Sequence, residues 1–220
     1  CIENLWNYID SGLVAVVKEM FSSKGRLMIS GIAKSAIIGN KIVATLNSTG
    51  TPSIFMHAAE AIHGDLGIIQ PNDIVICISK SGNTPEIKVL TPLVKANGNK
   101  LIAMVGNIDS YLAKSADYVL NCTVDKEACP NNLAPTSSTT AQLVMGDALA
   151  VALLNCRNFT AQDFAKYHPG GSLGKRLYLK VSDLYVKNEK PSVSLTTPLT
   201  ETLMEITSKR LGCTVVEEND

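Results

Sequence analysis

Five short, almost continuously apolar runs alternate with stretches of helical periodicity, and this alternation constrains the fold more than any other feature of the chain. Runs this short and this apolar are typical of strands buried on both faces, as in a parallel sheet covered by helices. The predicted helices lie at about residues 34–48, 84–97, 110–115 and 138–156, and the predicted strands are Arg26–Ser30, Ser53–His57, Asp73–Ser79, Lys100–Val105 and Asp117–Cys122. Strand and helix in regular order predict a doubly wound α/β domain.

The two ends of the chain lie outside this alternation. Between residues 2 and 21, apolar side chains recur every three or four positions, which predicts one amphipathic helix. From about residue 187 the sequence becomes a linker-like stretch rich in Asn, Pro, Ser and Thr, and a short helix-and-strand unit follows it. We therefore expect a main domain over residues 1–186, and a linker with a short C-terminal segment over residues 187–220.

Charge is scarce and balanced in this sequence. Charged residues make up 18% of the chain, which predicts a large buried core extended by a subunit interface. Twenty basic residues cancel twenty acidic ones, so no overall field attracts nucleic acid or an anionic membrane. No uninterrupted apolar stretch approaches the roughly 18 residues that a membrane-spanning helix needs. The six cysteines lie far apart, which is typical of reduced thiols in a cytoplasmic protein.

Function is expected in the loops after the strands, because ligands of open parallel sheets bind beyond the carboxyl ends of the strands. The first such loop, Ser30–Ser35, places a glycine turn, Lys34 and the Ser35 hydroxyl at a helix start, where a small anion can bind. Met28 and Ala33 stand where a Walker phosphate loop requires glycines, so nucleotide hydrolysis is not expected. A helix cap with a solvated lysine explains the same residues equally well.

The second loop carries three hydroxyl residues, Ser79, Ser81 and Thr84, between a buried strand and a helix. Hydroxyls and free helix N–H groups can together hold a phosphate without formal positive charge. An ordinary strand-to-helix turn also favours Ser, Gly, Asn and Thr, but three hydroxyls in six residues favour phosphate. Glu86 follows in the first turn of the predicted helix.

In the third loop, Glu127 precedes five consecutive hydroxyl residues, Thr136 to Thr140, that open the long apolar helix. One hydroxyl is enough to cap a helix, so a polar ligand would explain the excess. The Glu127 carboxylate adds a proton acceptor in the same neighbourhood.

The three histidines and one hydrolase-like motif complete the search for chemistry. His57, His63 and His168 lack the helical spacing that would make two of them metal ligands, so no metal site is expected. Residues 170–174 match the pattern of a hydrolase nucleophile elbow. Residues 163–167 before them predict a helix rather than the strand that this elbow requires, so a serine hydrolase is not expected either.

Eight segments share their order and spacing with a known family. They are Gly31–Ser35, Ala44–Pro52, His63–Gly67, Ser79–Gly82, Lys126–Pro130, Leu133–Thr140, Val144–Ala150 and His168–Gly174. Together they resemble the sugar isomerase (SIS) domain of the D-arabinose 5-phosphate isomerases. The resemblance covers about residues 20 to 185 and is most specific from Glu127 to Leu149.

The resemblance implies a three-layer α-β-α sandwich of flavodoxin-like type with a five-stranded parallel sheet, assembled as a homotetramer of two dimers. It also implies interconversion of D-ribulose 5-phosphate and D-arabinose 5-phosphate through an enediolate, without metal or organic cofactor, in the cytoplasm. The product supplies 3-deoxy-D-manno-octulosonate (Kdo) for lipopolysaccharide or capsule. Family members commonly continue into a pair of regulatory CBS domains, and residues 198–216 resemble only the opening of the first. Without a complete pair, feedback by a nucleotide-activated Kdo sugar is expected to act at the sugar site.

The resemblance also implies roles for individual residues. Glu127 is the first choice for the base that moves a proton between C1 and C2, and Glu86 is the alternative. His168 and His63 suit proton transfer between the sugar oxygens and ring opening, with His168 reaching across a subunit interface. Lys34 suits stabilisation of the enediolate or phosphate charge. The expected substrate-binding hydroxyls are Ser35, Ser79, Ser81, Thr84, Ser137, Ser138 and Thr139, and the departures from the family pattern include Lys80 in place of an asparagine.

Two other functions fit the same residues. One is a non-catalytic phosphosugar-binding regulator, and the other is an isomerase of a different sugar phosphate on the same fold. The retained glutamates and histidines argue against the regulator, and a turnover assay decides. Comparing ribulose 5-phosphate with hexose and heptose phosphates would separate the two isomerases.

Overall fold

The structure is a computed structural model that describes residues 2–185 and 189–218. It divides into two compact units, Cys1–Tyr167 and His168–Asp220. The domain boundary predicted between residues 186 and 187 lies outside the described residues.

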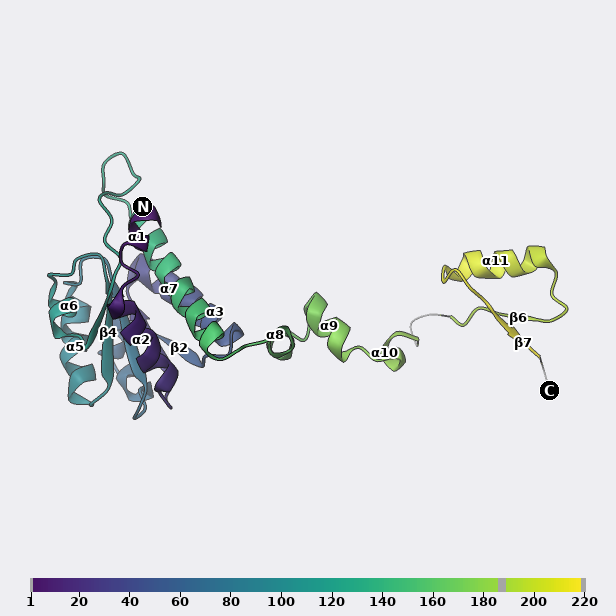
Figure 1. Ribbon diagram of the computed structural model, residues 1–220, viewed down its shortest axis with the longest axis horizontal. Helices are drawn as coiled ribbons and strands as arrows, with labels where there is room; N and C mark the ends of the chain where they lie inside the picture. The colour runs from purple at the N-terminus through teal and green to yellow at the C-terminus, as the bar shows by residue number, and fades with distance from the viewer. Residues whose placement is uncertain (1, 186–188, 219–220) are drawn as a thin grey trace. The chain divides into compact units, whose positions relative to one another are not determined.

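A five-stranded parallel sheet forms the centre of the first unit (Figure 1). Its strands, in spatial order, are β2 (Ser53–His57), β1 (Leu27–Gly31), β3 (Ile74–Ser79), β4 (Lys100–Val105) and β5 (Tyr118–Asn121). The chain leaves β1 first for β2 on one side and then for β3 on the other, so strand order reverses between β1 and β3. The predicted doubly wound sheet is confirmed, and every predicted strand matches within one residue at either end.

Helices cover both faces of this sheet (Figure 1). The helices of one layer are α2 (Ser11–Ser22), α3 (Ala33–Ser48) and α7 (Ser137–Cys156), and those of the other are α4 (Ala58–Ala61), α5 (Pro85–Ala96) and α6 (Tyr111–Ser115). Alternate side chains of β3 point to opposite faces, so Ile76 joins the first core and Cys77 the second. Both faces are covered because the central residues of the strands are apolar on both sides of the sheet, which confirms the predicted three-layer sandwich.

The helix α7 is long and apolar enough to cross a membrane by length and composition alone. In the structure it packs against α3 and buries Met145, Leu149 and Leu153 in the core. Gly146 permits this packing, because a Cβ there would lie 2.4 Å from two carbons of Ile42 on α3. α7 is therefore a core helix, and its first turn lies near the carboxyl end of β3.

The prediction of one helix over residues 2–21 is wrong. Two helices, α1 (Ile2–Trp6) and α2, replace it, and the break lies at Asp10. The Asp10 carboxylate accepts hydrogen bonds from the N–H groups of Gly12 (2.8 Å) and Leu13 (3.2 Å), which starts a new helix. Leu5 and Leu13 reach the same core from the two helices, so the apolar spacing continues across the break.

The remaining elements lie at the end of the first unit and in the second. α8 (Ala161–Tyr167) ends the first unit and confirms that the residues before the hydrolase-like motif are helical. The second unit contains α9 (Ser172–Tyr178), α10 (Val181–Tyr185), β6 (Ser192–Ser194), α11 (Leu199–Lys209) and β7 (Val215–Glu217). β6 and β7 pair in parallel, so the short helix-and-strand unit predicted for the C-terminal segment is present.

Asp73 fixes the amino ends of β1 and β3. Its carboxylate is buried and accepts hydrogen bonds from the N–H groups of Arg26 (2.8 Å) and Gln70 (2.9 Å) and from the Arg26 guanidinium (2.7 Å). Burial raises the pKa of Asp73, but these donors outweigh burial and hold the pKa below its ordinary value.

We expect Asp73→Asn to lower the free energy of unfolding by about 2 kcal/mol at neutral pH, because the charge-assisted bonds are lost. Because the pKa of Asp73 is lower in the folded than in the unfolded state, its ionised carboxylate stabilises the fold at pH values above the ordinary aspartate pKa. This stabilisation is lost as the pH falls through the pKa of Asp73 in the folded state. Urea unfolding at a series of pH values should therefore show the wild type converging on the variant in acid. Asp109→Asn, at an exposed loop position, is the matched control. A difference independent of pH would contradict the assignment.

Candidate functional site

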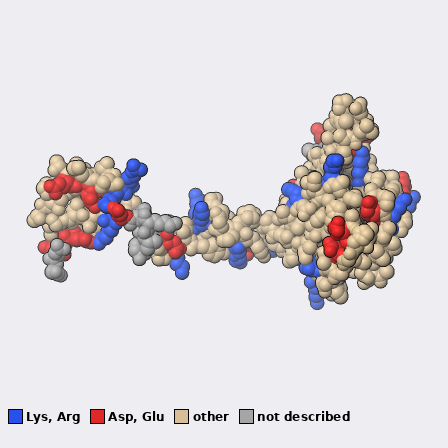
Figure 2. Space-filling model, turned by 180° about the vertical axis from the view of Figure 1, so that it is seen from behind, with Lys and Arg blue, Asp and Glu red and all other residues tan. Residues whose placement is uncertain are grey.

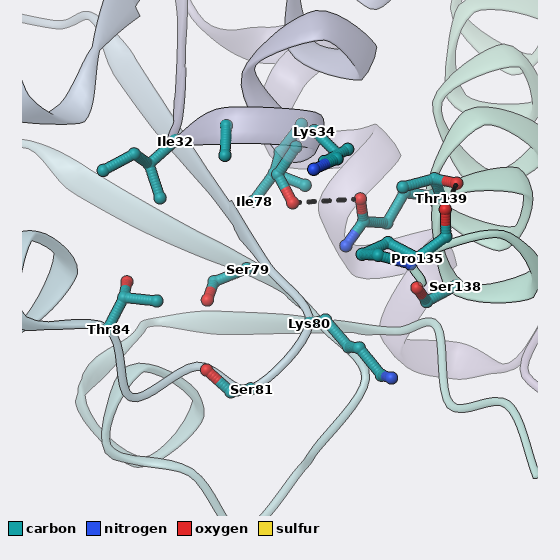
Figure 3. Close-up of a pocket in the computed structure, with 13 residues that line it drawn as sticks. Ile32, Lys34, Ile78, Ser79, Lys80, Ser81, Thr84, Pro135, Ser138 and Thr139 are labelled. Carbon is teal, nitrogen blue, oxygen red and sulfur yellow. Dashed lines mark hydrogen bonds between the residues drawn. The ribbon is translucent and has the colours of Figure 1, made fainter. Parts of the chain in front are cut away.

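A pocket of about 290 Å³ lies beyond the carboxyl ends of β1 and β3, where strand order reverses (Figure 3). Three segments line it: the start of α3, the loop between β3 and α5, and the start of α7. The lining residues are Ile32, Ala33, Lys34, Ser35, Ile78, Ser79, Lys80, Ser81, Thr84, Pro135, Ser138, Thr139 and Gln142. The fold thus brings together the three loops that the sequence singles out.

The loop after β3, Ser79–Thr84, presents its hydroxyls to this pocket. The Ser79 hydroxyl oxygen accepts a hydrogen bond from the N–H of Gly82 (3.1 Å), which closes the turn. Thr84 stands at the N-cap position of α5, yet its hydroxyl does not cap the helix. The Thr84 hydroxyl oxygen is buried and has no hydrogen-bond partner among the described residues. Buried hydroxyl groups in proteins are nearly always hydrogen-bonded, and a polar ligand in the pocket can provide the partner for Thr84.

The start of α3 forms the second wall. Ile32 occupies the N-cap position, so no side chain caps this helix. A helix start without a side-chain acceptor, next to the exposed Lys34, favours an anion. The Ser35 hydroxyl donates to the Gln142 side-chain oxygen at 3.2 Å, a bond that joins α3 to α7 (Figure 3).

A buried carboxylate, Glu127, lies behind the third wall. Its side chain has no exposed surface, and its oxygens accept hydrogen bonds from the N–H groups of Thr136 (2.8 Å) and Ser138 (3.1 Å) and from the Ser138 hydroxyl. The Lys80 ammonium nitrogen lies 2.7 Å from Glu127 Oε1. Burial alone would raise the pKa of Glu127, but Lys80, Ser138 and the backbone N–H groups outweigh burial and hold this pKa well below its usual range. Glu127 is therefore ionised at neutral pH.

The structure places the residues singled out in the sequence in different ways. Six of the seven hydroxyl residues and Lys34 line the pocket, whereas Ser137 lines a separate hollow together with Glu127. Glu86, half-buried in the first turn of α5, and His63, exposed between α4 and the short helix η1 (Asp65–Ile68), are not among the lining residues. His168 is the first residue of the second unit and is not among the lining residues of this pocket.

Two lining residues escaped the sequence reasoning. Gln142 is buried on α7, four residues after Ser138, so both side chains share one face of the helix. A polar pair at this spacing on the buried face of the helix, among apolar residues such as Ala141 and Met145, is a signal that could have identified Gln142. Lys80 stood out in the sequence only as a departure from a family pattern, because its partner Glu127 is far along the chain.

The positive charge at the site is local. On the face that Figure 2 shows, the basic and acidic side chains of the first unit are interspersed and form no continuous basic patch. The pocket itself has two lysines, Lys34 and Lys80, and Lys80 is already paired with Glu127. This arrangement suits a small anion rather than a polyanion.

Comparisons with known proteins show which family and which proteins the chain is similar to. The SIS domain family matches residues 20–152. Arabinose 5-phosphate isomerase KdsD of Pseudomonas aeruginosa is 53% identical over 216 residues, with 98% of this chain and 66% of the relative covered. The enzyme of the same name from Escherichia coli K12 is 50% identical over 217 residues, with the same coverage of 98% and 66%. The chain thus spans slightly less than two thirds of the length of these relatives.

Among solved structures, E. coli CFT073 c3406 in complex with arabinose 5-phosphate has 43% sequence identity and a TM-score of 0.73. The match covers 76% of this chain and 91% of that one.

Proposed function

The chain belongs to the SIS domain family, and on this premise we propose that it interconverts D-ribulose 5-phosphate and D-arabinose 5-phosphate. The observation that carries the proposal is the pocket at the switch point, where hydroxyls, uncapped helix starts and Lys34 meet next to an ionised carboxylate. The relatives named arabinose 5-phosphate isomerase and the solved relative in complex with arabinose 5-phosphate support the choice of sugar.

The phosphate group of the sugar is proposed to bind at Ser79, Ser81 and Thr84. Thr84 offers a buried hydroxyl without a partner among the described residues. Ser35, Ser137, Ser138 and Thr139 are proposed to bind the sugar. Binding energy from the phosphate, which does not react, can position C1 and C2 against the catalytic groups.

The reaction requires a proton to move between neighbouring carbons. A base removes a proton from C1 of ribulose 5-phosphate, and the C2 carbonyl oxygen takes up a proton to give an enediol. The base then returns a proton to C2, while the C1 hydroxyl loses its proton and becomes the aldehyde oxygen. Glu127 is the proposed base and Glu86 the alternative, because one carboxylate on one face of the planar intermediate can serve both carbons.

The other proposed roles concern charge and the oxygen-bound protons. Lys34 would stabilise the negative charge that develops on the enediolate. His63 and His168 would move protons between O1 and O2 and open the sugar ring. His63 is exposed in the first unit, and His168 lies in the second.

The wider context of the reaction is proposed on the same premise. We expect a cytoplasmic homotetramer that needs no metal or organic cofactor and supplies Kdo synthesis. Feedback by a nucleotide-activated Kdo sugar would act by competition at the sugar site.

The test is turnover by the purified chain. Incubated with D-ribulose 5-phosphate, it should form D-arabinose 5-phosphate and reach the same equilibrium from either side, as followed by NMR. Hexose and heptose phosphates, assayed in parallel, should react far more slowly. Binding of the pentose phosphates without turnover would contradict the proposal and indicate a regulator. Faster turnover of a hexose or heptose phosphate would indicate an isomerase of another sugar.

A further inference from the structure

Lys80 connects the hydroxyl-bearing loop after β3 to the buried carboxylate of Glu127. It directly follows Ser79, the last residue of β3, and its carbonyl oxygen accepts a hydrogen bond from the N–H of Gly106 (3.0 Å). The backbone of Lys80 is therefore fixed to the carboxyl end of β4. Its side chain lines the pocket and extends from the loop toward the α7 wall, where the ammonium nitrogen lies 2.7 Å from Glu127 Oε1 (Figure 3).

The two partners of this ion pair differ in how firmly they are held. Glu127 is fully buried and keeps the N–H groups of Thr136 and Ser138 and the Ser138 hydroxyl as donors even without Lys80. The Lys80 side chain is 48% exposed, and Glu127 is its one ion-pair partner in the described part of the chain. An ion pair with one partner this exposed stabilises the fold only weakly. Lys80 can therefore change partner without unmaking the buried hydrogen bonds.

An anion in the pocket competes for the same ammonium group. The Lys80 side chain is part of the pocket wall, next to the hydroxyls of Ser79 and Ser81. A phosphate dianion carries more charge than a carboxylate and has three acceptor oxygens for an ammonium group. Lys34, the other lysine of the pocket, has no ion pair within the described residues. An anion in the pocket therefore does not compete with a carboxylate for the Lys34 ammonium group.

We propose that Lys80 is an additional substrate-binding residue, whose ammonium group is shared between Glu127 and the phosphate of the bound sugar. The inference rests on the proposed function and deepens it. Phosphate binding draws Lys80 away from Glu127, and this removes one of the groups that keep the carboxylate ionised. Because Lys80 is one cause of the lowered pKa of Glu127, its withdrawal raises that pKa, and the carboxylate becomes a stronger base when substrate is present.

The test is a double-variant cycle with inorganic phosphate as the probe, measured by titration calorimetry on the whole chain. Lys80→Asn should weaken phosphate binding about tenfold, whereas Lys80→Arg, which keeps the charge, should change it less than about threefold. Glu127→Gln should tighten phosphate binding several-fold, because Lys80 is freed from its partner. In the Lys80→Asn background, Glu127→Gln should gain much less, since no ammonium group remains to be freed.

The proposal fails if Lys80→Asn leaves phosphate affinity unchanged, or if Glu127→Gln tightens binding equally in both backgrounds. Lys88→Asn is the matched control, because it removes one positive charge from an exposed position on α5 and should have little effect. Urea unfolding of each variant checks the fold. If Lys80→Asn is unstable, the cycle with Glu127→Gln can be measured in the Lys80→Arg background instead. Turnover by the wild type tests the proposed function separately, so that function can fail while the coupling between Lys80 and Glu127 stands, or the reverse.

Discussion

Replacing Glu127 by glutamine is expected to lower turnover of ribulose 5-phosphate about a hundredfold to ten-thousandfold, the range typical of a positioned proton-transfer group. Glutamine matches glutamate in size, and its carbonyl oxygen can still accept hydrogen bonds from the N–H groups of Thr136 and Ser138. The fold should therefore persist while the base is lost. In deuterated water, NMR of the substrate should show that deuterium no longer enters at C1 or C2.

Glu86→Gln tests the alternative base, since Glu86 lies in the first turn of α5 and, like Glu127, is not among the residues that line the pocket. With Glu127 as the base, deuterium exchange should persist in Glu86→Gln. Exchange at the wild-type rate in Glu127→Gln, together with its loss in Glu86→Gln, would move the base to Glu86. Weaker binding cannot account for the expected loss, because the same Glu127 variant is expected to bind phosphate more tightly.

Gly82→Ala is expected to lower the free energy of unfolding by about 2–4 kcal/mol. The expected causes are backbone strain, a steric clash and loss of a helix cap. Gly82 has a φ of +63°, a conformation that alanine adopts only with strain. A Cβ there would lie 2.1 Å from the Ser110 hydroxyl oxygen. Ser110 must then move, although its hydroxyl caps α6 by accepting a hydrogen bond from the N–H of Ala113 (3.3 Å). Urea unfolding measures the total.

Gly98→Ala is the matched control for the steric part of this effect. Gly98 has a φ of +81° but nothing within 4 Å of the Cβ position, so it should lose only about 1 kcal/mol. Because Gly82 shapes the loop that carries Ser79 and Ser81, Gly82→Ala should also raise KM for the sugar phosphate, and Gly98→Ala should not. Equal losses of stability in the two variants would contradict the steric explanation.

The strands could be predicted from the sequence because burial on both faces leaves a direct trace, a short run of apolar residues. The N-terminal helices could not be separated in this way. The break at Asp10 is a local hydrogen-bonding event, while the apolar spacing that periodicity detects runs through it. Periodicity reports which side of a segment is buried, and it does not report whether the backbone is continuous.

The candidate site could be predicted only in part for a related reason. Hydroxyls clustered after Ser79 and before Gln142 are visible as local composition, and the fold brings them into one pocket. The ion pair between Lys80 and Glu127 joins two loops far apart in the sequence, so no local pattern contains it. The exposed position of His63 likewise depends on the path of the chain after α4, which the sequence did not indicate.

The contact between α3 and α7 has a consequence for the choice of substrate. These helices carry two walls of the pocket. The bond between Ser35 and Gln142 joins them at the pocket, and Gly146 lets them approach one turn further along α7. The separation of these two walls thus depends on the spacing of the helix pair, whereas the loop between β3 and α5 forms the remaining wall. Under the proposed function, we therefore expect discrimination between sugars of different length to depend partly on Gly146, which does not line the pocket.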